Sequence, residues 1–298
     1  MSVSKTSTIA NYVLLIFIWA TTPLAIVWSV SDLYYLWALI LRFWIALPIA
    51  LLLLLVLRIR LPLHKIALHS YLAGAMSFIG SQIFTYMATQ YLSSGMIALM
   101  FGLAPLIAGL IGFFIFKQKL KPSQWVGMLI ALLGLAVISL SDSAHHVQVV
   151  GLLLMLCSVS IYALSIFWVK QVNAQVEPMA QATGSILFSV ILTFLIVPFI
   201  LPYAPTMLPE GRALLSIGYV VIMSSLVAMF CYFNLVRSLS ATTLSLTTVI
   251  TPMLAILIGA WLNHETLTMM ILFGALILIT GLFIYFYSDL KPRKIRRL

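Results

Sequence analysis

The side chains that could do chemistry in this sequence are few, and most of them lie within long apolar segments. Arg42 is the one charged residue well inside such a segment. A guanidinium at that depth costs at least about 2.5–3.5 kcal/mol, so it needs oxygen acceptors, water or an anion. Two interpretations of Arg42 stay open. It is a counter-charge for a substrate carboxylate, or it is a structural residue that binds backbone carbonyls or reaches outward to Asp32 or Asp142.

Three prolines predict irregular backbone inside the apolar segments. Pro105 and Pro252 lie near the middle of two segments, and Pro23 lies in the first one. A proline inside a helix cannot donate to the carbonyl four residues earlier, and a freed carbonyl needs a partner in hydrocarbon. The sequence therefore predicts helix kinks at these positions. They either form a polar notch beside a substrate path or are static kinks that serve packing.

Other polar and aromatic side chains recur inside the same segments. Thr243, Thr247 and Thr251 are spaced by four residues, so they lie on one face of a helix. A few polar groups in apolar surroundings are typical of a small-molecule site, whereas hydrogen bonding between membrane helices is the alternative use of threonine. The candidate substrate-binding residues are Trp19, Thr22, Arg42, Gln82, Tyr86, Met100, Tyr162, Asn234, Thr243 and Thr247.

The remaining reactive side chains exclude most other chemistry. All six acidic residues and all five histidines lie in loops or near the ends of the apolar segments, and the sequence has no His-Glu-x-x-His motif. Cys157 and Cys231 lie in apolar runs, which is not the pattern of a disulfide framework or a metal site. We therefore expect no enzyme, no metal and no cofactor. Because no carboxylate is expected at mid-depth, export of cations in exchange for protons is disfavoured.

Membrane-spanning helices must position these side chains. Of the 298 residues, 63% are hydrophobic and 7% are charged. This composition excludes a soluble enzyme, a disordered protein and a free nucleic-acid binder, so no nucleic acid is an expected partner. A helix needs about 20 apolar residues to cross the hydrocarbon core, and open strands cannot cross it. Ten such runs are predicted, at Ile9–Ser29, Tyr35–Leu57, Ile66–Ala88, Gly95–Phe116, Gln124–Leu140, Val149–Val169, Ala180–Leu201, Ala213–Val236, Thr242–Leu262 and Leu267–Tyr287.

The basic residues predict how these runs are oriented. Of the 16 lysines and arginines, 14 fall on one side of a ten-span chain, Arg212 falls on the other side, and Arg42 lies inside a span. Basic residues in short loops favour the cytoplasmic side of the membrane. Both termini are therefore expected in the cytoplasm.

The chain also repeats itself. An offset of 147 residues places Pro105 on Pro252, and it places Gly112, Gly127 and Gly134 on Gly259, Gly274 and Gly281. Residues 1–144 and 145–298 are therefore interpreted as two related halves of five helices each. Because five is odd, the second half is inverted relative to the first, as in many transporters. The expected fold is an all-α integral membrane protein with ten transmembrane helices in two inverted five-helix repeats.

Small residues also predict how the last helix of each half packs. Gly127, Ala131 and Gly134 give one helix a small face, and Gly274 and Gly281 do the same for its counterpart. Close packing between membrane helices explains such faces, and a homodimer contact is the alternative.

Several motifs together point to a family. They are Trp19 in the first helix, Leu41-Arg42-Phe43 in the second, Ala104-Pro105 and Thr251-Pro252 in the fourth and ninth, and the turn Asn263-His-Glu265-Thr-Leu267. In these features the chain resembles the bacterial drug/metabolite transporter superfamily, in its EamA-domain branch, from Ile9 to Tyr287. One departure is Gln118, which stands where the family has a glutamate after the fourth helix, whereas the second half keeps Glu265.

The resemblance implies a secondary active transporter in the bacterial inner membrane. The expected substrates are small neutral or zwitterionic metabolites, such as amino acids, exported by alternating access at a mid-membrane cavity between the repeats. Efflux of multidrug or cationic compounds, and uptake of a metabolite, stay open as alternatives. The expected partners are the small-molecule substrate, the lipid bilayer and a candidate coupling proton, and the expected state is a monomer or a homodimer.

Overall fold

The computed structural model of the chain describes residues 5–115, 117–141, 149–239 and 247–290, and within these ranges all regular elements are helical. The elements are α1 (Lys5–Ser29), α2 (Tyr35–Val56), α3 (Lys65–Ala75), η1 (Met76–Ser81), α4 (Gln82–Ala88), α5 (Ser94–Gly102), α6 (Ala104–Phe114), α7 (Pro122–Ser141), α8 (Val149–Val172), α9 (Pro178–Ile200), η2 (Leu201–Tyr203), α10 (Gly211–Tyr219), η3 (Val220–Val227), α11 (Ala228–Ser238), α13 (Thr247–Asn263) and α14 (Met269–Leu290).

The outer surface of these helices is apolar. Phe199, Leu55 and Phe114 expose 81%, 75% and 70% of their side chains, which is a surface suited to lipid and not to water. Seven described segments are long and apolar enough to cross a membrane, and two further apolar helices, at Pro122–Ile138 and Thr247–Asn263, are shorter. The expectation of an all-helical, multi-pass membrane protein is therefore confirmed, whereas the number of ten spans stays a prediction.

Two of the long helical segments contain a wide turn near the middle. The segment that begins with α3 passes through the π-helical η1 before it continues as α4, and the segment that begins with α10 passes through the π-helical η3 before α11. A π-turn holds one residue more than an α-turn, and it is often found at functional sites. The two wide turns lie in corresponding places of the repeat that the sequence predicts.

The three prolines differ in what they do to the backbone. Pro23 and Pro252 lie inside α1 and α13. At Pro105 the helix is interrupted for one residue, because α5 ends at Gly102, Leu103 keeps right-handed helical dihedral angles, and α6 starts at Ala104. Pro105 thus lies in the first turn of α6, where its missing N–H costs little. The two helices together form one apolar segment, Ser94–Phe114, that is long enough to cross a membrane.

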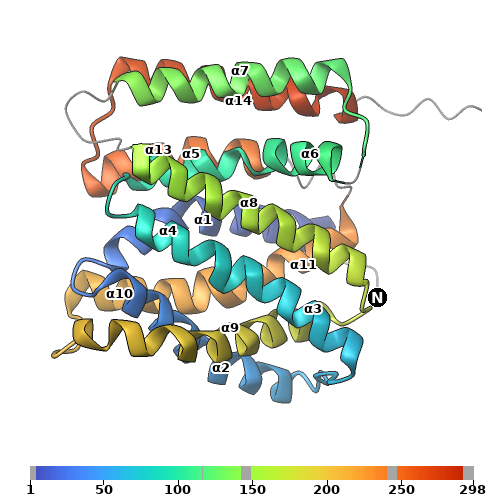
Figure 1. Cartoon of the computed structure of the whole chain (residues 1–298), viewed down its shortest axis with the longest axis vertical. Helices are drawn as coiled ribbons and strands as arrows, with labels where there is room; N and C mark the ends of the chain where they lie inside the picture. Colours follow the sequence, from blue (N-terminus) through green and yellow to red (C-terminus); the bar gives the residue numbers. More distant parts are fainter. Residues whose placement is uncertain (1–4, 116, 142–148, 240–246, 291–298) are drawn as a thin grey trace, which may run out of the picture.

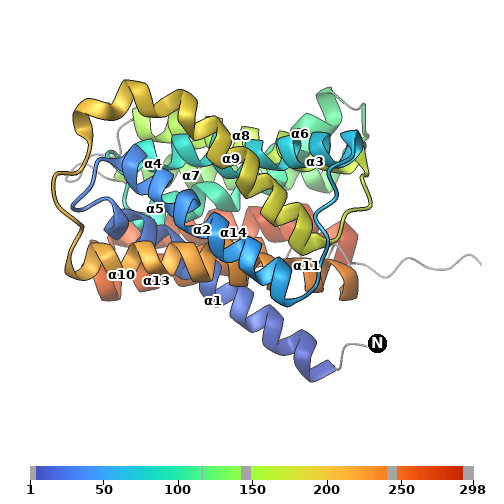
Figure 2. The same ribbon diagram turned by 90° about the horizontal axis from the view of Figure 1, so that it is seen from below.

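The helices form a layered bundle (Figure 1). α7 and α14 run side by side as a separate outer layer at the top of the view, and α2 and α9 form the opposite edge. Seen from below, α2 crosses in front of the other helices, and the first turns of α1 project away from the bundle (Figure 2). One apolar core cluster joins α5, α7, α8, α13 and α14, and a second joins α1, α2, α4, α9 and η3.

The outer layer is held by glycines. A Cβ atom at Gly134 would lie 2.4 Å from the backbone nitrogen of Leu278 and 2.6 Å from the carbonyl oxygen of Gly274. A Cβ at Gly281 would lie 2.4 Å from the backbone nitrogen of Ala131. The backbones of α7 and α14 therefore touch, as small residues at membrane helix interfaces allow. The predicted close packing of these two helices is confirmed.

Candidate substrate site

Five polar side chains from four helical segments meet inside the bundle. We call Thr22, Arg42, Gln82, Ser224 and Ser225 the polar cluster. The Arg42 guanidinium donates from Nε to the Ser225 hydroxyl at 2.9 Å and from Nη1 to the Gln82 side-chain carbonyl at 3.3 Å. The Thr22 and Ser224 hydroxyls lie 2.8 Å apart and share a hydrogen bond. Two of the predicted site residues, Arg42 and Gln82, thus bind each other, and a third, Thr22, binds Ser224, the chain neighbour of Ser225.

Arg42 is buried without an anionic partner. Only 6% of its surface is exposed. Its two hydrogen-bond acceptors are both neutral, and among the described residues neither a carboxylate nor a backbone carbonyl binds it. Asp32, which the sequence offered as a partner, instead accepts hydrogen bonds from the Ser31 hydroxyl and the Glu210 backbone N–H. Asp142, the other carboxylate that the sequence offered, lies outside the described residues.

The polar cluster joins the two wide turns. Ser224 and Ser225 lie within η3, and Gln82 is the residue that directly follows η1. The Ser225 hydroxyl donates to the carbonyl of Val220 at 2.8 Å while it accepts from Arg42. Because Ser225 and Gln82 come from the two π-containing segments, Arg42 connects the π-helical regions of both.

Aromatic side chains lie near the cluster and on neighbouring helices. Trp19 is one helical turn from Thr22 on α1, and its ring centroid lies 5.6 Å from that of Tyr232 on α11. Phe101 of α5 meets Tyr162 of α8 edge to face, with centroids 6.3 Å apart. Such ring pairs offer an apolar wall with faces that attract cations.

The other predicted site residues are more widely distributed. Tyr86 is fully buried, and its hydroxyl, like that of Thr251, has no hydrogen-bond partner among the residues that the structure describes. Met100 is fully buried within an apolar core cluster. Asn234 is half-buried on α11, and Thr247 is the buried first residue of α13. Thr243 lies outside the described residues, so its place on the predicted threonine face stays a prediction.

A second polar network, which the sequence interpretation missed, closes one end of the bundle. Glu265 accepts hydrogen bonds from the Ser94 backbone N–H at 3.0 Å, the Ser94 hydroxyl at 2.6 Å and the Gly95 backbone N–H at 3.1 Å. The Asn263 side chain donates to Glu265 at 3.1 Å and accepts from the Trp28 indole N–H at 2.8 Å. A carboxylate at the start of α5 satisfies free backbone N–H groups and complements the helix dipole. This Glu265 network ties the ends of α1, α5 and α13 together.

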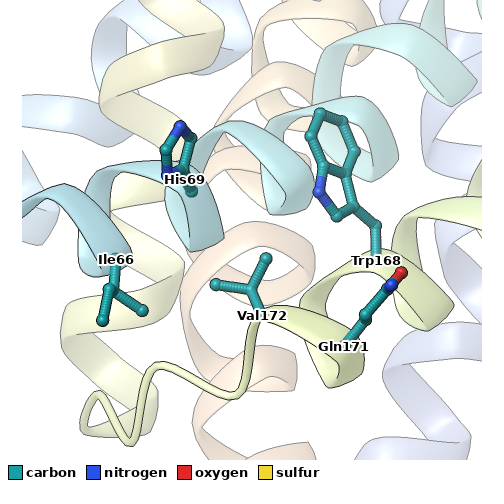
Figure 3. Close-up of a pocket in the computed structure, with 5 residues that line it drawn as sticks. All are labelled: Ile66, His69, Trp168, Gln171 and Val172. Carbon is teal, nitrogen blue, oxygen red and sulfur yellow. The ribbon is translucent and has the colours of Figure 1, made fainter.

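A pocket of about 450 Å³ opens elsewhere, between the beginning of α3 and the end of α8 (Figure 3). Its lining is Ile66, His69, Trp168, Gln171 and Val172. These residues belong to helix ends, not to the polar cluster, and the lining carries no carboxylate or guanidinium. The polar cluster, with its buried cation, is therefore the stronger candidate for substrate recognition.

Comparison with known protein families identifies one family for this chain. The model of the EamA-like transporter family matches the chain twice, at residues 6–140 and 149–287. The chain is 24% identical over 237 residues to the uncharacterized transporter YvbV of Bacillus subtilis (strain 168), covering 74% of this chain and 73% of that protein. It is 26% identical over 210 residues to the uncharacterized inner membrane transporter YedA of Escherichia coli (strain K12), and this match covers 70% of this chain and 67% of YedA.

A solved crystal structure shares the fold. It superposes with a TM-score of 0.65 at 17% sequence identity, and the match covers 94% of this chain and 96% of that chain. At this identity the likeness concerns the fold alone. Two family matches across most of the sequence, and a multi-pass helical bundle, lead to one conclusion: the chain belongs to the EamA-like transporter family and is a membrane transporter.

Proposed function

We propose that the protein is a secondary active transporter that exports small neutral or zwitterionic metabolites, of which amino acids are the leading class. Alternating access would take place around the polar cluster, between two inverted five-helix repeats that together make ten spans. The observation that carries the proposal is the polar cluster itself, since it contains residues from both family matches and connects the wide turns of both. Inverted repeats that rock around a shared mid-membrane site are the usual basis of such transport.

The charge in the cluster favours this substrate class over cationic drugs. A buried guanidinium repels a cationic substrate, and the described carboxylates all lie in the last turn of a helix, at helix ends or between helices: Asp32, Glu177, Glu210, Glu265 and Asp289. A proton or another ion gradient would supply the driving force. The inner-membrane location that the name of YedA carries is the location we propose here.

Flux measured in proteoliposomes tests the function. Purified protein would be reconstituted and supplied with a panel of labelled metabolites, under imposed pH and sodium gradients applied separately. We expect counterflow of at least one amino acid or related zwitterion, and its dependence on one gradient would identify the coupling ion. Flux of cationic compounds alone would contradict the proposal.

The proposed topology predicts a labelling pattern. In a background with Cys157→Ser, cysteines placed at Ser143 and Thr206 should react with a membrane-impermeant maleimide added outside the cell, because both positions follow the predicted outward ends. Cysteines placed at Lys119 and Lys294 should react only after the membrane is opened, since lysine-rich segments favour the cytoplasm. Labelling of Lys119→Cys from outside intact cells would overturn the ten-span arrangement.

Acidic residues should be individually dispensable for flux. Each of Asp32, Asp142, Glu177, Glu210, Glu265 and Asp289 would be replaced by its amide, and flux would be normalised to the amount of folded protein. Because no carboxylate is expected at mid-membrane depth, we expect every variant to keep proton-coupled flux within about a factor of three. Complete loss in one folded variant would show that transport uses a protonatable acid.

A further inference from the structure

We propose that Arg42 binds the carboxylate of the transported molecule, which narrows the substrate class to carboxylate-bearing zwitterions. The inference rests on the proposed transport function and concerns the chemistry of its binding site. The first observation is that the polar cluster contains a buried positive charge. A guanidinium with 6% of its surface exposed has two neutral acceptors and no anion among the described residues.

An unpaired cation inside a membrane protein is costly, and neutral oxygens compensate it only in part. Arg42 is the eighth residue of α2, which places it about 10 Å along the helix axis from the first residue. At that depth the residue is well inside the hydrocarbon region of a spanning helix. A compensating anion is therefore most valuable there, and a substrate carboxylate supplies one during each transport cycle.

The guanidinium also keeps donors for such a ligand. An arginine has five N–H donors, and the two hydrogen bonds of Arg42 use one from Nε and one from Nη1. Nη2 makes no hydrogen bond within the described part of the chain. The two N–H groups of Nη2 and the remaining one of Nη1 are therefore donors that a carboxylate can use. Ser225 and Gln82 hold the guanidinium through Nε and Nη1 and so fix its plane.

The surroundings suit the remainder of a zwitterion. No carboxylate lies in the polar cluster to bind an ammonium group, but Trp19 lies one turn along α1 from Thr22 and is paired with Tyr232. Ring faces attract ammonium groups and also accept apolar side chains. A molecule with its carboxylate at Arg42 could thus place its ammonium group or side chain toward Trp19.

A purely structural Arg42 would make the same two hydrogen bonds, so the test must measure selectivity as well as stability. Purified protein would be titrated with each of the common L-amino acids and with its carboxamide, with thermal stabilisation as the measure of affinity. The wild type should bind at least one amino acid about 10- to 100-fold more tightly than its amide, which is the range for a charge-assisted hydrogen bond. Arg42→Gln should bring this ratio close to one, and Arg42→Lys should lower it severalfold, because lysine lacks the planar fork.

The matched control is Arg60→Gln, which removes an exposed arginine in the segment between α2 and α3 and should leave the ratio unchanged. If Arg42→Gln does not fold, Arg42→Lys alone still decides, since a structural role predicts no change in its ratio. An unchanged ratio in the folded variants, equal binding of acid and amide by the wild type, or no amino acid that stabilises the wild type would each overturn the inference. Flux in proteoliposomes separates this from the proposed function. If the protein transports an amino acid but the acid-to-amide ratio does not depend on Arg42, only the carboxylate site is rejected. If the ratio depends on Arg42 but no flux is measured, only the transport function is rejected.

Discussion

Replacing Gly134 with leucine should separate α7 from α14 and leave little correctly folded protein in the membrane. The Cβ of any residue at this position would lie 2.4 Å from the Leu278 backbone nitrogen and 2.6 Å from the Gly274 carbonyl oxygen. Backbone atoms cannot turn away as a side chain can, so the two helices must move apart along their interface. Overpacking of this kind costs about 3 kcal/mol or more. The yield of monodisperse protein and its melting temperature in mild detergent would measure the effect.

A glycine in an open position provides the control for this change. A Cβ at Gly218 on α10 would have no neighbour within 4 Å, so Gly218→Ala should fold like the wild type, with a small gain from helix propensity. Gly134→Ala should lie between the two, because one methyl group demands a smaller separation. A wild-type melting temperature for Gly134→Leu would mean that α7 does not pack on α14 as described.

Removing the Glu265 carboxylate should be the second most damaging change. Glu265→Ala leaves the backbone N–H groups of Ser94 and Gly95, together with the Asn263 side chain, without their acceptor. Unsatisfied donors at a helix start cost about 2 kcal/mol together, so the melting temperature should fall by about 5 °C. We also expect the ends of α1, α5 and α13 to separate more often. A cysteine at Ser93, directly before α5, would then react faster with an impermeant maleimide.

Two variants show whether the hydrogen bonds are the cause. Glu265→Gln keeps one oxygen acceptor and should restore about half of the loss. Glu177 precedes α9 without a side-chain cap, so Glu177→Ala should change neither stability nor labelling. Equal losses in Glu265→Gln and Glu265→Ala would instead assign the effect to the negative charge at the start of α5.

Composition and small-residue spacing were sufficient to predict the helical membrane class and the close packing of α7 and of α14, but not that these two helices contact each other. Both depend on features that a sequence carries directly, namely long apolar runs and glycines one or two turns apart. The wide turns η1 and η3 were not predicted, because a π-turn has no local residue signature. Instead, each of the two π-turns makes contacts with helices that are distant in the sequence. The Ser81 hydroxyl, at the end of η1, lies 2.9 Å from the Ser158 hydroxyl on α8, and Ser225 in η3 binds Arg42 on α2.

The candidate site was likewise predicted only in part. The position of Arg42 well inside an apolar segment was enough to single it out in the sequence. Its hydrogen-bond partners, however, come from segments 40 and 183 residues away in the chain. Asp32 was the nearer carboxylate in sequence, yet it accepts a hydrogen bond from the Glu210 backbone N–H in the segments between helices. Glu265 was noticed only as a departure between the two halves, since nothing in its own neighbourhood points to the start of α5. Charge and spacing therefore identified the residues, whereas three-dimensional proximity decided what they bind.

The pairing of α7 with α14 also determines when the outer layer can form during synthesis of the protein. Roughly 130 residues of chain separate the two helices, and at about 5–20 residues per second a ribosome needs on the order of 10 s to make that stretch. During this time α7 is already made, but the helix that covers its glycine face does not yet exist. Until synthesis reaches α14, the contact surface of α7 must be covered by lipid or by the insertion machinery. α14 is thus the helix that completes the outer layer, and chains that stop before it leave the glycine face of α7 without its partner.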